Sequence, residues 1–189
     1  MKSSKIVRLC MMAMLSAIAV VLVMMYRTPL LAAAPYMEYD MADIPVLIAT
    51  MMFGIFPGLA VLLLVSVIQA FLLGGNSWMG LIMHFVASGT LVIIVGLFHC
   101  KADKRWKTIL GMVLGTFGMA AIMILMNLFL TPIFLVQAIK DVIAMLIPVI
   151  IPFNLLKAGI NCAITFVLMA ILNPIIKKNP QIFSACNIK

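Results

Sequence analysis

Long apolar runs separated by short polar breaks dominate this chain. The breaks predict helices at about 6–26, 41–56, 58–73, 78–100, 106–130 and 149–176. Most of these runs reach the ~20 residues that a helix needs to cross a bilayer. None alternates apolar and polar residues over ~10 positions as the strands of a membrane β-barrel do. The pattern therefore predicts an all-α membrane protein in which residues 1–189 form one transmembrane domain of six helices.

The second and third apolar runs are short, and they allow two arrangements. They could form a re-entrant hairpin, or they could be two separate spans. The segment from Phe53 to Gly58 (Phe-Gly-Ile-Phe-Pro-Gly) and the segment Gly74-Gly75-Asn76 both carry turn residues. Two tight turns on opposite sides of the membrane favour separate spans.

Composition agrees with a membrane protein and makes the basic residues informative. The chain is 66% hydrophobic and 10% charged, whereas a soluble domain is about a quarter charged. The net charge of +8 does not indicate nucleic-acid binding, because the basic residues lie between apolar spans, where they set orientation. The first apolar run, Leu9–Tyr26, is longer than the ~7–15 residues typical of a signal peptide, so we expect a retained first helix.

Ten of the thirteen basic residues fall on one side of a six-span arrangement. They lie before the first helix, between the fourth and fifth, and after the sixth: Lys2, Lys5, Arg8, Lys101, Lys104, Arg105, Lys107, Lys177, Lys178 and Lys189. Because cytoplasmic loops carry the excess of Lys and Arg, we expect both termini of this multi-pass protein to be cytoplasmic. The longer loops then face outward.

Lys157 is the only full charge inside the last apolar run. Asn154, Lys157 and Asn161 follow the i, i+3, i+7 spacing that places them on one stripe of a helix. A lone ammonium group facing hydrocarbon costs several kcal/mol. The stripe must therefore face a partner, a cavity or a bound ligand.

Other polar residues are expected at the same depth, in the outer third of the bilayer. The rise of 1.5 Å per residue places His84, Asn127 and Gln69 near the stripe, beneath the first outer loop and Asn76. This convergence indicates a ligand pocket that opens to the outside. The alternative for Gln69 and Asn127 is a hydrogen bond between helices, and His84 could be a packing residue. Glu38, Asp40 and Asp43 lie in or near the first outer loop; they could be solvated, or one of them could pair with Lys157.

No motif for catalysis is present. The chain has no phosphate-binding loop, no His-Glu-x-x-His and no Gly-x-Ser-x-Gly sequence, so we expect neither an enzyme nor an ATPase. His84 and His99 lie at opposite ends of one expected helix, which argues against a shared metal ion. We expect no metal and no cofactor.

Five segments together resemble a known family. They are Glu38–Pro45, Gln69–Asn76, Met83–Phe85, Asn127–Pro132 and Pro148–Asn161. They are similar to segments of the six-helix substrate-binding (S) components of energy-coupling factor (ECF) vitamin transporters, above all the riboflavin-specific ones. The likeness covers nearly the whole chain, and Pro148–Asn161 is its most specific part.

The resemblance implies a riboflavin receptor that works with a transmembrane coupling protein and two ATP-binding cassette subunits. In that family an Ala-x-x-x-Ala motif on the first helix docks the coupling protein, and here Ala13 and Ala17 match it. The resemblance, together with the depth argument, implies that the ligand contacts are Glu38, Tyr39, Met41, Ala42, Asn76, Trp78, His84, Asn127, Asn154, Lys157 and Asn161. Riboflavin is expected as the transported ligand, in a chain otherwise surrounded by lipid.

Three alternatives remain at this point. The chain could be an S component for another vitamin. It could be a small ion- or proton-coupled carrier in which Lys157 titrates. It could also be an assembly subunit whose polar stripe only holds helices together. The carrier predicts uptake by the chain alone, and the assembly subunit predicts no small ligand.

Overall fold

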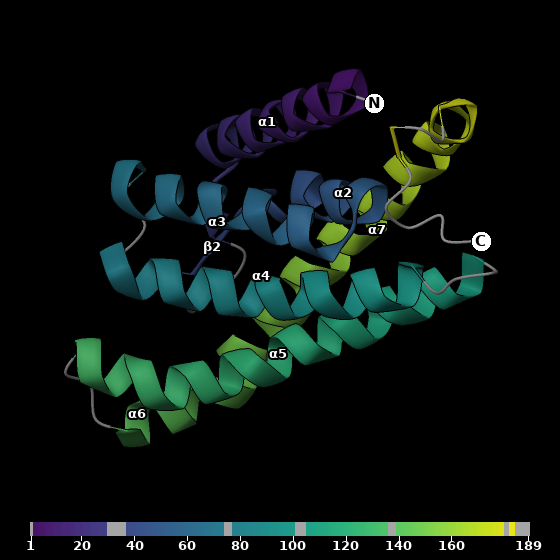
Figure 1. The fold of residues 1–189 in the computed structure, drawn as a ribbon. Coiled ribbons are helices and arrows are strands. Elements are labelled where there is room, and N and C mark those ends of the chain that lie inside the picture. The colour runs from purple at the N-terminus through teal and green to yellow at the C-terminus, as the bar shows by residue number, and fades with distance from the viewer. Residues whose placement is uncertain are drawn as a thin grey trace.

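The computed structural model describes residues 2–29, 37–73, 77–100, 105–135, 139–179 and 182–183, which form a bundle of helices (Figure 1). The helices are α1 (Lys2–Met25), α2 (Asp43–Phe53), α3 (Ile55–Leu72), α4 (Ser77–Cys100), α5 (Arg105–Leu135), α6 (Ile139–Met145), the π-helical turn η1 (Leu146–Ile150) and α7 (Ile151–Lys178). Five stretches of the described residues are long and apolar enough to cross a membrane: Ser4–Met25, Ile55–Leu72, Trp78–Cys100, Arg105–Ile133 and Ile139–Lys178. The prediction of a helical, multi-pass membrane protein is confirmed.

The remaining expected span corresponds to α2, which is the most buried helix of the bundle. Its 11 residues cover ~16 Å, about half of the ~30 Å hydrocarbon thickness. Every one of its residues is buried, and it packs against α1, α3, α4 and α7. A helix that is apolar on all sides suits such a position. The short second apolar run is therefore a core helix enclosed by the longer ones.

The turn between α2 and α3 comes earlier in the chain than expected. The second and third helices were expected at 41–56 and 58–73, but α2 ends at Phe53, α3 begins at Ile55, and Gly54 alone separates them. Gly54 has a φ of 102°, in the region that favours glycine, and its N–H donates to the carbonyl of Thr50. Pro57 fits in the first turn of α3 because the N–H groups there have no partner within the helix.

We expect Gly58→Ala to destabilise the protein, because α2 and α3 approach each other closely at this glycine. A methyl group at Gly58 would overlap the side chain of Thr50, which is fully buried and donates to the carbonyl of Val46. Overpacking of this kind costs about 1–3 kcal/mol. Thermal unfolding in detergent measures the loss. The matched control is Gly159→Ala in α7, where an added methyl group meets no atom within 4 Å; an equal loss in both variants would contradict the close approach as the cause.

Helical structure extends beyond the expected bounds at two prolines. α5 runs to Leu135 with Pro132 inside it, whereas the expected end was residue 130. The last helix was expected at 149–176 and α7 spans Ile151–Lys178, but α6 and η1 before it extend the apolar stretch back to Ile139. Prolines are tolerated in membrane helices where local widening or neighbouring groups satisfy the freed backbone, and the π-helical turn η1 contains Pro148.

The two ends of the bundle differ. Figure 1 shows that α1 begins and α7 ends at the same end, where α4 also ends and α5 begins. At the opposite end, α1 leads into β1 (Thr28–Pro29), which pairs antiparallel with β2 (Glu38–Tyr39), Thr28 opposite Tyr39. This short hairpin positions the segment that follows it, residues 40–42, at the start of α2. The polar groups described next lie in this half of the bundle.

Candidate ligand-binding site

The polar stripe of α7 faces the interior of the bundle. Asn154, Lys157 and Asn161 are 1%, 6% and 0% exposed, so the prediction that the stripe turns away from lipid is confirmed. Asn154 donates to the carbonyl of Ile150 at 2.7 Å, one turn earlier in the chain. The other two side chains bind the segment that enters α2.

Lys157 is neutralised by Asp40. Its Nζ donates to Asp40 Oδ2 at 2.8 Å, and both side chains are almost completely buried. The same carboxylate oxygen accepts from Gln69 Nε2 at 3.3 Å, and Oδ1 accepts from the Ala42 N–H at 3.1 Å. Burial raises the pKa of Asp40, but the ammonium of Lys157, the nearby His84 and the hydrogen bonds from Lys157 and the Ala42 N–H together lower it below the ordinary 3.8. The acid left open by the sequence is therefore Asp40.

Asn161 fastens the first outer segment to α7. Its Oδ1 accepts from the Tyr39 hydroxyl at 2.7 Å, and its Nδ2 donates to the Asp40 carbonyl at 3.2 Å and to Asp43 Oδ2 at 3.4 Å. Burial and the nearby Asp40 carboxylate raise the pKa of Tyr39 above its ordinary 10, so the hydroxyl remains a donor. One amide thus uses both its oxygen and its nitrogen to hold residues 39–43 in place.

A second ion pair lies nearer the surface. Arg27 Nε is 2.7 Å from Glu38 Oε2, and Arg27 Nη1 donates to the carbonyl of Leu73 at 2.6 Å. Arg27 therefore links the β1–β2 hairpin to the end of α3. Because both partners are partly exposed, this pair contributes less to stability than the buried one.

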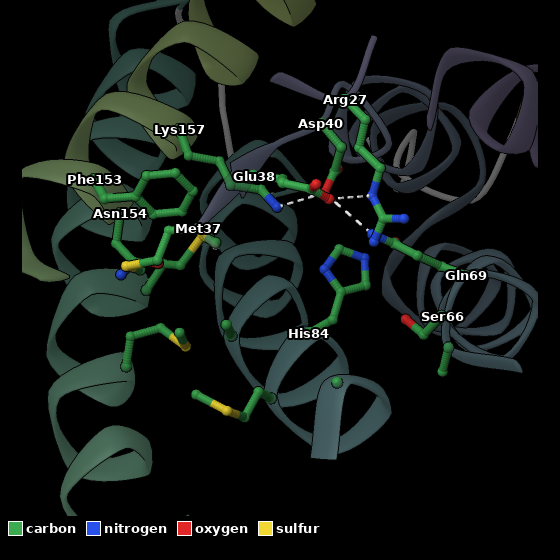
Figure 2. Close-up of a pocket in the computed structure, with 16 residues that line it drawn as sticks. Arg27, Met37, Glu38, Asp40, Ser66, Gln69, His84, Phe153, Asn154 and Lys157 are labelled. Atoms are coloured by element: carbon green, nitrogen blue, oxygen red, sulfur yellow. Dashed lines mark hydrogen bonds and ion pairs between the residues drawn. The ribbon is translucent and has the colours of Figure 1, made fainter. Parts of the chain in front are cut away.

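These groups border a cavity of about 390 Å³ between α3, α4, α5 and α7, within the ~300–1,000 Å³ range of small-molecule sites. Figure 2 shows Phe153 and Asn154 on one side, Ser66 and Gln69 on the other, and His84 between them. The described lining consists of Arg27, Met37, Glu38, Asp40, Ser66, Gln69, Ala70, Gly80, Met83, His84, Ala87, Met119, Met123, Phe153, Asn154 and Lys157. Each charged residue among them is paired with an opposite charge, so the cavity is close to neutral. No cluster of three His, Cys, Asp or Glu side chains suited to a metal occurs among the described residues.

Four of the residues expected from the sequence line this cavity: Glu38, His84, Asn154 and Lys157. Tyr39, Ala42 and Asn161 are buried beside it and hold the first outer segment, and Met41 packs against the core. Asn76 lies outside the described residues. The roles of all these residues in ligand binding stay predictions.

Two expected contacts lie away from the cavity walls. Asn127 is buried on α5, where its Nδ2 donates to the Met123 carbonyl and its Oδ1 accepts from the Thr131 hydroxyl. The Trp78 side chain is 63% exposed and packs edge-on against Phe71. Ala13 and Ala17, the expected docking residues, are exposed on α1, as a contact with another membrane protein requires.

Several lining residues were not anticipated. Met119 and Met123 follow the i, i+4 spacing of one helix face. The sequence pattern of an apolar residue that faces a cavity does not differ from that of one that faces lipid. Ser66 was also missed, although it stands three residues before Gln69, which was expected near the pocket, and a second polar residue in an apolar helix was a signal that the sequence did offer. Arg27 also lines the cavity and was not among the expected contacts.

A membrane-embedded helical bundle with a partly polar cavity of this size has the features of a membrane protein that binds a small ligand. This chain belongs to the family of ECF transporter substrate-specific components, which matches residues 7–169. It is therefore a component of a transporter in the plasma membrane.

Curated relatives carry more specific names. "Riboflavin transporter RibU" of Streptococcus thermophilus is 33% identical over 171 residues, covering 86% of this chain and 80% of the relative. "Riboflavin transporter FmnP" of Bacillus subtilis is 30% identical over 180 residues, covering 88% and 92%. A solved structure described as "Structure and mechanism of the S component of a bacterial ECF transporter" superposes with a TM-score of 0.79 at 26% identity, covering 92% of this chain and 99% of that one. The S-component fold is confirmed.

Proposed function

We propose that this chain captures riboflavin from outside the bacterial cell and delivers it through an ECF transporter. The observation that carries the proposal is the cavity, which offers two different kinds of surface. Met119, Met123 and Phe153 provide polarisable and aromatic contacts for a flat ring. Polar atoms on α3, α4 and α7 provide directed hydrogen bonds for the pyrimidine edge and the ribityl hydroxyls. The names of the curated relatives support the same ligand.

The ligand contacts we propose are those named from the sequence, with the cavity-lining members Glu38, His84, Asn154 and Lys157 as the primary ones. Lys157 uses one of its three donors on Asp40, which leaves donors for a ligand. Tyr39 and Asn161 act by positioning the first outer segment. Riboflavin is transported cargo and serves no catalytic step in this proposal.

We propose the six-span topology with both termini in the cytoplasm. The distribution of basic residues supports it, because the end of the bundle where α1 begins and α7 ends carries Arg105, Lys107, Lys177 and Lys178. The cavity then opens to the outside. On the cytoplasmic side the chain would work with a transmembrane coupling protein, docked at Ala13 and Ala17, and with two ATPase subunits.

The proposal is tested by purifying the full chain in detergent. We expect it to carry a yellow, flavin-like absorbance or, once stripped, to quench riboflavin fluorescence on binding. Thiamine and biotin serve as control vitamins and should not compete. A chain that binds either control and not riboflavin would be an S component for another vitamin, and the riboflavin proposal would fail.

Liposome uptake separates this proposal from a proton-coupled carrier. We expect no riboflavin uptake by the chain alone, with or without a pH gradient, because transport requires the partner ATPases. Uptake driven by a pH gradient alone would contradict the proposal and would favour the carrier in which Lys157 titrates.

A further inference from the structure

One wall of the cavity carries polar atoms without partners. Ser66 Oγ, Gln69 Oε1 and His84 Nε2 are buried, line the cavity and have no hydrogen-bond partner among the described residues. Ser66 is only 1% exposed. A buried polar atom left without a partner destabilises the fold, so three of them lining one cavity indicate a site for a ligand that supplies their hydrogen bonds.

The orientation of Gln69 is determined by its other contact. A carboxylate only accepts hydrogen bonds, so the Gln69 atom that meets Asp40 Oδ2 must be the amide nitrogen. Its carbonyl oxygen therefore remains available as an acceptor for the cavity. Ser66, one turn away on α3, can both donate and accept, and the imidazole nitrogen of His84 can do either according to its tautomer.

This mixture of donors and acceptors selects a particular chemistry. A phosphate or carboxylate needs donors on every side, and the Gln69 carbonyl would repel it. A hydroxyl group both donates and accepts, so a chain of hydroxyl groups can satisfy all three atoms. Ser66 and Gln69 are separated by ~4.5 Å along the helix axis, a spacing that hydroxyl groups on one extended chain can span.

We propose that Ser66, Gln69 and His84 form a subsite for the hydroxyl-bearing chain of the ligand, across the cavity from Phe153 (Figure 2). The ring of the ligand would lie against Phe153 and the lining residues Met119 and Met123. This inference rests on the proposed function, since riboflavin supplies both parts as a ribityl chain and an isoalloxazine ring. It assigns the hydroxyl-bearing chain of the ligand to one wall of the cavity and makes Ser66 a specificity-determining residue.

Ser66→Ala tests the subsite with two flavins. Riboflavin carries the ribityl chain, whereas lumiflavin has the same ring with a methyl group in its place. We expect Ser66→Ala to weaken riboflavin binding by about fivefold to tenfold, the loss of one hydrogen bond, and to leave lumiflavin binding unchanged. Fluorescence quenching by the purified full chain measures both affinities.

Ser88→Ala is the matched control. Ser88 is also a fully buried serine with an unpartnered hydroxyl, but it does not line the cavity. We expect Ser88→Ala to change neither affinity. His84→Phe keeps a ring of similar shape and, like Ser66→Ala, should weaken riboflavin binding and leave lumiflavin binding unchanged. Agreement between the two variants would show that the loss of affinity does not come from a folding defect in one of them.

The outcomes separate the two proposals. If the wild-type chain binds neither flavin, the proposed function fails. If it binds riboflavin and Ser66→Ala has no effect, or weakens both flavins equally, the subsite is wrong and water or the ring occupies this wall. A loss for riboflavin alone, absent in Ser88→Ala, supports the subsite.

Discussion

Asp40→Asn is expected to destabilise the folded protein by about 3–5 kcal/mol, the range measured when one partner of a buried ion pair is removed. The Asp40 and Lys157 side chains are 4% and 7% exposed, so the substitution leaves an ammonium group buried without a counter-charge. Lys157→Met should cost a similar amount, because it leaves the carboxylate with only the Gln69 amide and the Ala42 N–H. Thermal and denaturant unfolding of the purified chain in detergent measure both losses.

The double variant Asp40→Asn/Lys157→Met shows whether the cost is that of an orphaned charge. Replacing a buried pair by uncharged groups of similar volume is often neutral, so we expect most of the stability to return. Losses that simply add in the double variant would contradict this interpretation. Lys177→Met, at an exposed position near the end of the same helix, is the control for removing a lysine and should have almost no effect.

Much of the fold was predictable because the bilayer restricts what a backbone can do. Within lipid every backbone polar group must be satisfied internally, so the apolar runs had to be helices, and the charge of Lys157 had to face inward. The burial of α2 could not be read in this way. A helix that is apolar on all sides gives the same pattern whether it contacts lipid or protein, and the packing of α2 against α1, α3, α4 and α7 is what shows that it lies inside the bundle.

The part of the site formed by polar residues within an apolar helix was predictable from the sequence. The part that depends on how distant segments pack together was not. The stripe on α7 was found from spacing alone. The choice of Asp40 depended on the register of the β1–β2 hairpin, which pairs Glu38 with Pro29 and leaves Glu38 beside Arg27 and Asp40 beside Lys157. That register spans two residues on each strand, and no periodic signal in the sequence encodes it.

The variants of the ion pair also carry the second large expected effect, on riboflavin affinity. We expect Lys157→Met and the double variant Asp40→Asn/Lys157→Met each to bind riboflavin more than tenfold more weakly than the wild type, over ~1.4 kcal/mol. Both lose the ammonium donors that border the cavity. Fluorescence quenching, measured well below the unfolding temperature of each variant, gives the affinities.

Comparing affinity with stability in the same double variant separates two roles of Lys157. If Lys157 binds the ligand, the double variant regains its stability and still binds weakly, because an uncharged thioether cannot replace a donor. If Lys157 only holds residues 39–43 against α7, stability and affinity recover together in the double variant, and the assignment of Lys157 as a ligand contact is wrong.

Asn161 provides the reference for a residue that only positions residues 39–43. Asn161→Leu would leave the Tyr39 hydroxyl and the Asp40 carbonyl without their partner, and should therefore lower stability and affinity in parallel.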